Sequence, residues 1–315
     1  MTLYRQSVAG FSPVEAHLAD LLAEQMTLRT GRTPSTGEYR SWQRSIPALR
    51  ADLLSAGLGD VEMLVEYQLP LTSKRADVVL AGQHPTTGGP SYLVVELKQW
   101  SHAEQFEDSD ALVRIEEYGQ RPVTHPALQV RDYCDYLLGF TAVLADDPES
   151  LAGVAYLHNA TDSGVEDLFR LPGDRLGSVF TGQRRGEFQE FLKTRFAPGV
   201  SGASDADRLL ASRIAPSKQL LAVAAEEVQR REMFVLLDEQ RDAYNYVLHA
   251  VERARRSNTK TAVIVSGGPG SGKSVIALSL LGEMSRQGRS VLHATGSRSF
   301  TQTLRKVAGK RAPRV

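Results

Sequence analysis

The sequence predicts an α/β protein with two domains, and three observations support this fold class. Two runs rich in β-branched residues, 76–81 and 92–97, lie between segments with the periodicity of amphipathic helices. A glycine-rich turn at 267–274 is flanked by a predicted strand and a predicted helix. The chain of 315 residues is long enough for two hydrophobic cores, because domains usually span about 100–200 residues.

The first domain is predicted over residues 1–200. Ser12 and Pro13 are expected to start an amphipathic helix, as its N-cap and first helical residue. A connector rich in Gly, Pro and Thr at 82–91 predicts that the two β-branched runs form a hairpin. In chain order the predicted elements are helices over 13–28 and 46–54, strands over 61–69, 76–81 and 92–97, a helix over 128–143, a strand over 154–157 and a helix over 187–196.

The domain boundary is predicted where small and turn-forming residues gather, at 197–217. We expect a linker over 201–234 that contains a connecting helix at 220–230, and a second domain over 235–315. The predicted elements of that domain are a helix over 239–256, a strand over 261–266, a helix over 273–286 and a strand over 290–294. The last three together form a βαβ unit.

Composition excludes several classes of protein. The longest apolar runs are much shorter than the ~20 residues that span a bilayer, and the N-terminus lacks the pattern of a secretory signal. The single cysteine, Cys134, has no second cysteine for an internal disulfide, which favours a reducing, cytoplasmic setting. We therefore expect a cytoplasmic protein with no membrane partner.

Charge is unevenly distributed along the chain. Residues 1–200 hold 18 Lys and Arg against 27 Asp and Glu, whereas residues 201–315 hold 19 against 10. This asymmetry suits an enzyme whose carboxylates bind metal beside a separate basic surface that attracts phosphate. Electrostatic docking between the two domains explains the asymmetry equally well.

A P-loop is the most specific motif in the sequence. Residues 267–274, GGPGSGKS, fit the pattern G-x-x-x-x-G-K-S in the expected context of strand and helix. Backbone N–H groups of the turn would hold phosphate oxygens, Lys273 would contact the β- and γ-phosphates, and Ser274 would bind Mg²⁺. The predicted binding residues for ATP or another NTP are Gly267, Gly268, Pro269, Gly270, Ser271, Gly272, Lys273 and Ser274.

Asp77, Glu96 and Lys98 are the candidate catalytic residues of a second site. Glu96 and Lys98 share one face of their strand because side chains alternate, and hairpin pairing can bring Asp77 beside them. Asp77 and Glu96 would bind Mg²⁺ or Mn²⁺, while Lys98 would position water or stabilise charge during phosphodiester cleavage. From the residues alone, an ordinary ion pair on a surface hairpin is the alternative.

The segments ADVVLAG and YLVVELKQW resemble the core of the PD-(D/E)xK nuclease superfamily, although the proline before the aspartate is absent. Asp77, Glu96 and Lys98 fall on the catalytic positions of that superfamily. Gln129 and Tyr133 form a Q-x3-Y pattern similar to the motif that follows the lysine in nucleases of the RecB type. The resemblance implies a restriction-endonuclease-like α/β/α sandwich and adds Gln129 and Tyr133 to the catalytic residues.

A further acidic residue often completes such a site in this superfamily. Glu15, on the opening helix, is the first candidate, and Glu66, in the strand before the hairpin, is the second. Glu15 has an alternative role, because a carboxylate near a helix N-terminus stabilises the helix macrodipole by about 0.3–1 kcal/mol.

The second domain resembles superfamily 1 helicases. Gln240, in LLDEQRDAYNYVL upstream of the P-loop, is similar to the glutamine with which those helicases read adenine. The two motifs in this order resemble bacterial proteins that fuse a PD-(D/E)xK nuclease-like domain to a Schlafen-like DNA/RNA helicase domain. No acidic Walker B strand is visible after the P-loop, so we expect a partner or a missing C-terminal half to complete the RecA-like motor.

Three functions fit these features. The leading hypothesis is an ATP-binding nucleic-acid enzyme whose N-terminal domain cleaves DNA or RNA and whose P-loop motor loads or moves the substrate. The alternative, from a different class, is a nucleotide-gated switch that keeps the nuclease fold but only binds nucleic acid. A P-loop kinase ranks last, because the basic stretch after Gly296 suits phosphate contacts better than a kinase lid.

Overall fold

The computed structural model describes residues 2–11, 17–70, 72–107, 109–115, 122–214, 235–268, 270–289, 291 and 294. The chain divides into two units, Met1–Ala215 and Pro216–Val315. The mixture of helices and strands confirms the predicted α/β class.

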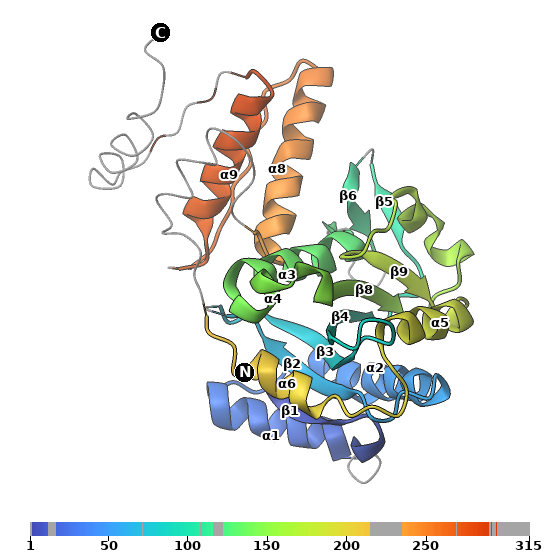
Figure 1. Ribbon diagram of the computed structural model, residues 1–315. Helices are drawn as coiled ribbons and strands as arrows, with labels where there is room; N and C mark the ends of the chain where they lie inside the picture. Colours follow the sequence, from blue (N-terminus) through green and yellow to red (C-terminus); the bar gives the residue numbers. More distant parts are fainter. Residues whose placement is uncertain are drawn as a thin grey trace. The chain divides into compact units, whose positions relative to one another are not determined.

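A six-stranded mixed sheet organises the first unit (Figure 1). Its order is β1-β2-β3-β4-β8-β9, with antiparallel pairing from β1 to β4 and parallel pairing from β4 to β9. The strands are β1 (Thr2–Ser7), β2 (Glu62–Gln68), β3 (Arg75–Gln83), β4 (Pro90–Lys98), β8 (Leu151–Leu157) and β9 (Ser178–Thr181). The predicted hairpin over 76–97 is therefore confirmed as β3 and β4.

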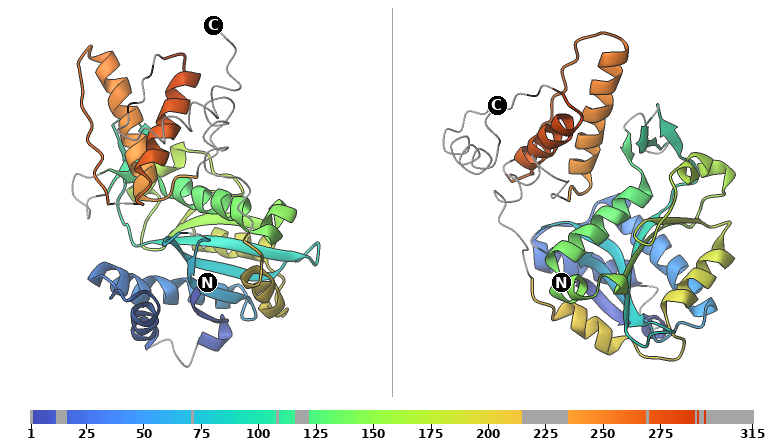
Figure 2. Two further views of the ribbon diagram at one scale, coloured as in Figure 1. Left: turned by 90° about the vertical axis from the view of Figure 1, so that its left-hand side faces the viewer. Right: turned by 45° about the horizontal axis from the view of Figure 1, so that its top comes forward.

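Helices cover both faces of this sheet, as the views in Figures 1 and 2 show for α1 and α2 on one side and α3 on the other. The first face carries α1 (Leu18–Thr30), α2 (Thr36–Ser55) and α5 (Arg185–Arg195). The second face carries α3 (Pro126–Phe140), which packs on β4 and β8, and α6 (Ala203–Leu210), which packs on β2 and β3. Short helical segments η1 (Ala9–Phe11), α4 (Ala142–Asp146) and η4 (Pro148–Ser150) complete the connections.

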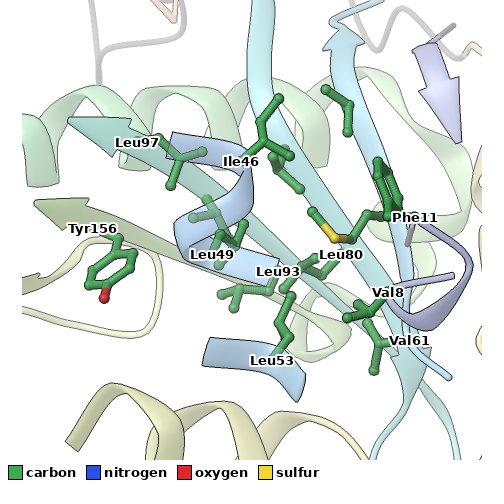
Figure 3. Packing of buried hydrophobic residues seen from close by; sticks show 14 of the residues in the cluster. Val8, Phe11, Ile46, Leu49, Leu53, Val61, Leu80, Leu93, Leu97 and Tyr156 are labelled. Carbon is green, nitrogen blue, oxygen red and sulfur yellow. The ribbon is translucent and has the colours of Figure 1, made fainter. Parts of the chain in front are cut away.

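The main core lies between the sheet and the helices on its first face, α2 among them (Figure 3). Ser35 and Glu38 form a reciprocal capping box that starts α2, and its apolar positions recur at helical spacing toward the sheet. Leu80 and Leu93 point into the same core because side chains alternate along β3 and β4. Alternation therefore sends Asp77 and Glu96 to the opposite face, which α3 covers.

A buried carboxylate joins three elements of this core. Asp52 of α2 is fully buried and accepts hydrogen bonds from Tyr156 Oη of β8 at 2.7 Å, Arg185 Nε at 2.5 Å and Gln189 Nε2 at 3.0 Å. A buried carboxylate needs such donors because its desolvation is otherwise uncompensated. Asp52 thus ties α2, α5 and β8 together.

A small antiparallel sheet follows β4 in the chain and was not predicted. It consists of β5 (Glu104–Phe106), β6 (Ser109–Arg114) and β7 (Val123–Thr124). Trp100 and the helical segment η5 (Ser163–Arg170) pack with it in a second apolar cluster. This cluster anchors the chain immediately beyond the end of β4.

In its described residues the second unit contains α8 (Glu239–Arg256) and α9 (Lys273–Arg286), whose Tyr244 and Ile276 form an apolar cluster with Leu236, which precedes α8. The strand predicted over 261–266 is wrong for this structure, because the segment is irregular and Ile264 is 89% exposed. A strand needs a neighbour to satisfy its backbone groups, and the described part of the second unit contains no strand to pair with.

Several predicted boundaries differ from the observed ones. The helix predicted over 46–54 is the second half of α2, whose Pro47 lies inside the helix. The helix predicted over 128–143 begins at Pro126, and α6 occupies part of the predicted linker at 201–234 because it packs on the sheet. The predictions for Ser12, Pro13 and 220–230 lie outside the described residues, as does most of 290–294.

Within the described residues, no helix has the length and apolarity required to cross a membrane.

We predict that Leu49→Ala lowers the free energy of unfolding of the first unit by about 2–5 kcal/mol, because Leu49 is fully buried in the main core. Both tryptophans of the chain, Trp42 and Trp100, lie in this unit, so fluorescence during urea denaturation reports on it alone. Leu28→Ala in α1 is the matched control, with an expected change within about 0.5 kcal/mol, because Leu28 is 72% exposed. Equal effects of the two substitutions would contradict the assigned core.

Candidate functional site

The hairpin of β3 and β4 brings Asp77 and Glu96 to neighbouring positions. The antiparallel ladder pairs Val78 with Val95, and Asp77 and Glu96 occupy the next position along the two strands. Asp77 Oδ2 accepts a hydrogen bond of 2.7 Å from the backbone N–H of Leu97, which fixes its carboxylate across the end of β4. The structure thus places the two predicted carboxylates together.

Lys98 lies at the centre of a chain of contacts that links the sheet to α3. Lys98 Nζ donates to Glu96 Oε1 at 2.7 Å and to Gln129 Oε1 at 2.9 Å. Gln129 Nε2 in turn donates to Tyr133 Oη at 3.0 Å, so the amide has one orientation that satisfies both contacts. Glu96 and Lys98 of β4 therefore form one connected group with Gln129 and Tyr133 of α3.

The ion pair between Lys98 and Glu96 is largely shielded from water. The side chains retain 14% and 6% of their exposure. The two charges of a buried ion pair attract each other more strongly than those of an exposed pair. Both charged groups also lose their hydration, and further hydrogen bonds are needed to offset that cost. Gln129 supplies such a bond to Lys98, and the ring of Trp100 lies 5.1 Å from Lys98 Nζ.

Glu66 lies opposite Asp77 in the register of β2 and β3, but its side chain serves another contact. Its φ of 52° interrupts the regular strand, and its carboxylate accepts from Trp42 Nε1 at 2.6 Å and pairs with Arg75 Nε at 2.6 Å. Burial raises the pKa of the Glu66 carboxyl, and Arg75 opposes that shift. The other expected acidic residue, Glu15, lies outside the described residues.

The carboxylates of Asp77 and Glu96 provide the hard oxygen donors that Mg²⁺ and Mn²⁺ prefer. In the described ranges, no group of three or more His, Cys, Asp or Glu side chains is arranged to hold a metal ion. The chemistry of the donor set fits a divalent cation held by two carboxylates, with its remaining positions left to water and substrate.

The P-loop in the second unit has the backbone that its glycines require. Gly270 and Gly272 have φ values of 76° and 83°, which L-residues rarely adopt. A Cβ on Gly272 would also lie 2.4 Å from Gln240 Nε2. Lys273 begins α9, and its Nζ donates to the carbonyls of Gly267 at 2.7 Å and Gly268 at 2.6 Å.

Gln240 at the start of α8 contacts the P-loop directly. Its Nε2 donates to the carbonyl of Ser271 at 3.2 Å, so the structure joins two segments that the sequence separates widely. Ser274 follows Lys273 in the first turn of α9 and is exposed, whereas Pro269 lies outside the described residues. The predicted nucleotide residues that are described therefore gather at one end of α9.

Residues 260–314 match the family model described as Schlafen group 3, DNA/RNA helicase domain. This match supports a Schlafen-like helicase domain in the segment that contains the P-loop, and it indicates a function related to nucleic acid. Comparisons with curated proteins and with solved structures found no match.

The Schlafen-like match begins after α8, so it includes the P-loop and α9 but neither Gln240 nor the first unit. Two separate observations therefore support the two sites. The segment of the predicted nucleotide site has a motif and a family match, whereas the candidate site around Lys98 has a motif and the contacts among Asp77, Glu96, Lys98, Gln129 and Tyr133.

Sequence reasoning missed three residues that position the site around Lys98. Gln99 ties the end of β4 to α2, Trp100 lies beside Lys98, and His125 starts α3. The pair His125 and Pro126 carried a usable signal, because proline is favoured at the first helical position after a capping residue. The contact of Trp100 with Lys98 had no signal in the sequence, because it depends on the path of the chain after β4.

His125 holds the N-terminus of the helix that carries Gln129. Its Nδ1 accepts from the backbone N–H of Ala127 at 3.1 Å, and its Nε2 therefore carries the proton donated to the carbonyl of Leu168 at 3.1 Å. Burial lowers the pKa of His125 from 6.5 to about 4, and the hydrogen bond to Leu168 opposes this shift.

We predict that the first unit loses stability as the pH falls from 6.5 to about 4, because the unfolded chain protonates His125 before the folded one does. The contribution of His125 is roughly 3 kcal/mol, fully present above pH 6.5 and lost below pH 4. The measurement is the free energy of unfolding against pH by tryptophan fluorescence. His125→Asn keeps a capping oxygen and should flatten the profile, whereas parallel profiles would contradict this role.

Proposed function

We propose that this protein is an ATP-binding nucleic-acid enzyme whose first unit cleaves phosphodiester bonds with a divalent metal, coupled to a P-loop helicase-like motor. The observation that carries the proposal is the contact chain from Glu96 through Lys98 and Gln129 to Tyr133, with Asp77 beside it. The helicase-domain match at 260–314 supports nucleic acid as the substrate class.

Each side chain of the first site has a distinct task in this proposal. Asp77 and Glu96 would hold Mg²⁺ or Mn²⁺, which when bound polarises a phosphodiester and lowers the pKa of water. Lys98 orients the attacking water and stabilises the negative charge that develops on the phosphate. Gln129 limits the rotation of the Lys98 ammonium, and Tyr133 limits the rotation of the Gln129 amide, so the charge is already in place before substrate binds.

The P-loop of the second unit is proposed to bind ATP or another NTP with Mg²⁺. Lys273 now donates to backbone carbonyls of its own loop, and phosphate oxygens of a nucleotide would replace these acceptors. Charged acceptors make stronger hydrogen bonds than neutral carbonyls, which favours this exchange. Ser274 supplies a hydroxyl for Mg²⁺, and Gln240 is positioned to connect adenine recognition to the loop through Ser271.

The second candidate function is a nucleotide-gated switch whose nuclease-like unit binds nucleic acid without cutting it. The contact of Gln240 with the P-loop favours a gating role, because nucleotide binding would alter the segment that Gln240 holds. Cleavage by the purified chain separates the two candidates.

We predict that the purified chain cleaves labelled DNA or RNA in Mg²⁺ or Mn²⁺ but not in EDTA, as gel electrophoresis would show. Asp77→Asn and Lys98→Ala should each reduce the cleavage rate by about 100-fold or more, because each removes charge from the reacting centre. Asp77→Asn preserves shape, so it tests chemistry even if loss of Lys98 leaves Glu96 uncompensated and unfolds the unit.

Lys193→Ala is the matched control for Lys98→Ala. Lys193 also pairs with a glutamate, Glu190, but 44% of its side chain is exposed, and no change in the cleavage rate is expected. Cleavage that survives in both Asp77→Asn and Lys98→Ala would reject the assigned site. Binding without any cleavage by the wild-type chain would support the switch instead.

We also predict that Lys273→Ala weakens binding of Mg-ATP by about tenfold or more, because it removes a charge-assisted hydrogen bond to phosphate. Gly272→Ala should weaken binding too, since its Cβ would displace the Gln240 side chain from the loop. Gly288→Ala is the control, because Gly288 has a similar φ of 69° but open space around it. Isothermal titration calorimetry measures the three affinities, and unchanged binding by Lys273→Ala would reject the nucleotide site.

A further inference from the structure

Two arginines of α2 form no ion pair within the described part of the first unit. Arg40 and Arg44 are exposed and lie one helical turn apart, so their like charges repel each other. Residues 1–200 hold 27 acidic side chains against 18 basic ones, so acidic partners are plentiful. Six other arginines of the unit do pair with carboxylates, namely Arg5, Arg75, Arg131, Arg175, Arg184 and Arg185, whereas Arg208 and Arg213 resemble Arg40 and Arg44 in being exposed without a described ion pair.

The position of these two arginines relates them to the candidate catalytic site. Gln99 follows Lys98 directly, and its Nε2 donates to the backbone carbonyl of Arg40 at 3.3 Å and to Ser45 Oγ at 3.2 Å. Asn159 Nδ2, beyond the end of β8, donates to the carbonyl of Gln99 at 3.3 Å. The segment of α2 that carries the arginines is therefore fastened to the edge of the sheet where Lys98 lies.

At this edge, the side chains of Lys98 and Gln99 contact helices on opposite faces of the sheet. Lys98 reaches Gln129 on α3, on one face of the sheet, whereas Gln99 reaches α2 on the other face. β4 and β8 are parallel, so both strands end at the same edge. A polyanion that crossed this edge could contact the carboxylate site and the arginines at the same time.

We propose that Arg40 and Arg44 bind backbone phosphates of the nucleic acid that enters the site of Asp77, Glu96 and Lys98. This inference rests on the proposed function for the choice of ligand. Arginine matches the geometry of phosphate oxygens with two N–H donors, and bound phosphate removes the repulsion between the two guanidinium groups. Phosphates recur along every strand, so two cations one helical turn apart contact the backbone without reading its sequence.

The test measures affinity under conditions that prevent cutting. The full chain is titrated into fluorescein-labelled single- and double-stranded oligonucleotides in EDTA, and anisotropy is followed over a series of NaCl concentrations. The double variant R40Q/R44Q should raise the Kd by about tenfold or more. The slope of log K against log salt should become less negative by about 1.4 for single strands or 1.8 for duplex DNA, as expected for two lost phosphate contacts.

Two further variants separate charge from structure. R40K/R44K keeps both cations and should retain most of the salt dependence, which a purely structural role for the arginines would not explain. R208Q/R213Q is the matched control, because Arg208 and Arg213 are exposed and lie toward the other end of the strands. There Tyr92 Oη, near the start of β4, donates to Asp205 O of α6, and Ala142 N, beyond the end of α3, donates to Arg213 O. The Kd and salt slope of this control should equal those of the wild-type chain.

The outcomes for the arginines and for cleavage are distinguishable. Loss of affinity in R40Q/R44Q without any cleavage by the wild-type chain supports the phosphate contacts while it rejects the nuclease proposal. Cleavage with an unchanged Kd and salt slope in R40Q/R44Q overturns the phosphate contacts alone. Equal losses in both double variants, or arginine-dependent binding of polyglutamate with no binding of nucleic acid, would also overturn the inference.

Discussion

The antiparallel pairing of β3 with β4 is the constraint on which the candidate catalytic site depends. The pairing sets Asp77 beside Glu96, and the N–H of Leu97 at the end of the ladder holds the Asp77 carboxylate. A shift of register by one residue would send Glu96 and Lys98 to the apolar face that α2 covers. The apolar alternation on that face, with Leu80 and Leu93 in the core, therefore protects the polar geometry on the other face.

The parallel pairing of β4 with β8 adds the second part of the site. A parallel connection needs a crossover, and here the crossover contains α3, whose first turns return to the end of β4. Gln129 consequently reaches Lys98, and Tyr133 lies one turn further along the same helix. His125 starts α3 with a neutral imidazole, so the placement of Gln129 depends on a residue that titrates.

In the first unit, the contacts of the charged side chains depend on their burial as well as on the excess of acidic residues. Carboxylates outnumber cations, but Asp52, Glu66 and Glu96 are all buried and matched with donors. Burial of such groups restricts their geometry, because each must keep its donors to offset desolvation. Arg40 and Arg44 of α2 are exposed instead, and the hydrogen bonds of Gln99 to Arg40 O and Ser45 Oγ hold their segment against the end of β4.

The sequence by itself determined the elements whose signals are local. The hairpin of β3 and β4 was predicted from two β-branched runs and the connector between them, the helices α8 and α9 from helical periodicity, and the P-loop from its motif. The grouping of Asp77, Glu96, Lys98, Gln129 and Tyr133 was also anticipated, because a motif fixes the spacing of residues that must meet. The catalytic roles of these residues are still proposals.

The tertiary structure decided the features that depend on partners distant in the chain. β9 has only four residues and β1 lacks a β-branched run, so neither carries a clear pattern, and both form because a neighbouring strand pairs with them. Conversely, residues 261–266 have the composition of a strand but no described strand beside them, so they stay irregular. Glu66 had the register position of a site residue, yet contacts with Trp42 and Arg75 hold it elsewhere. Local composition specifies what a segment can form, whereas hydrogen-bond partners and packing from distant segments determine what it does form.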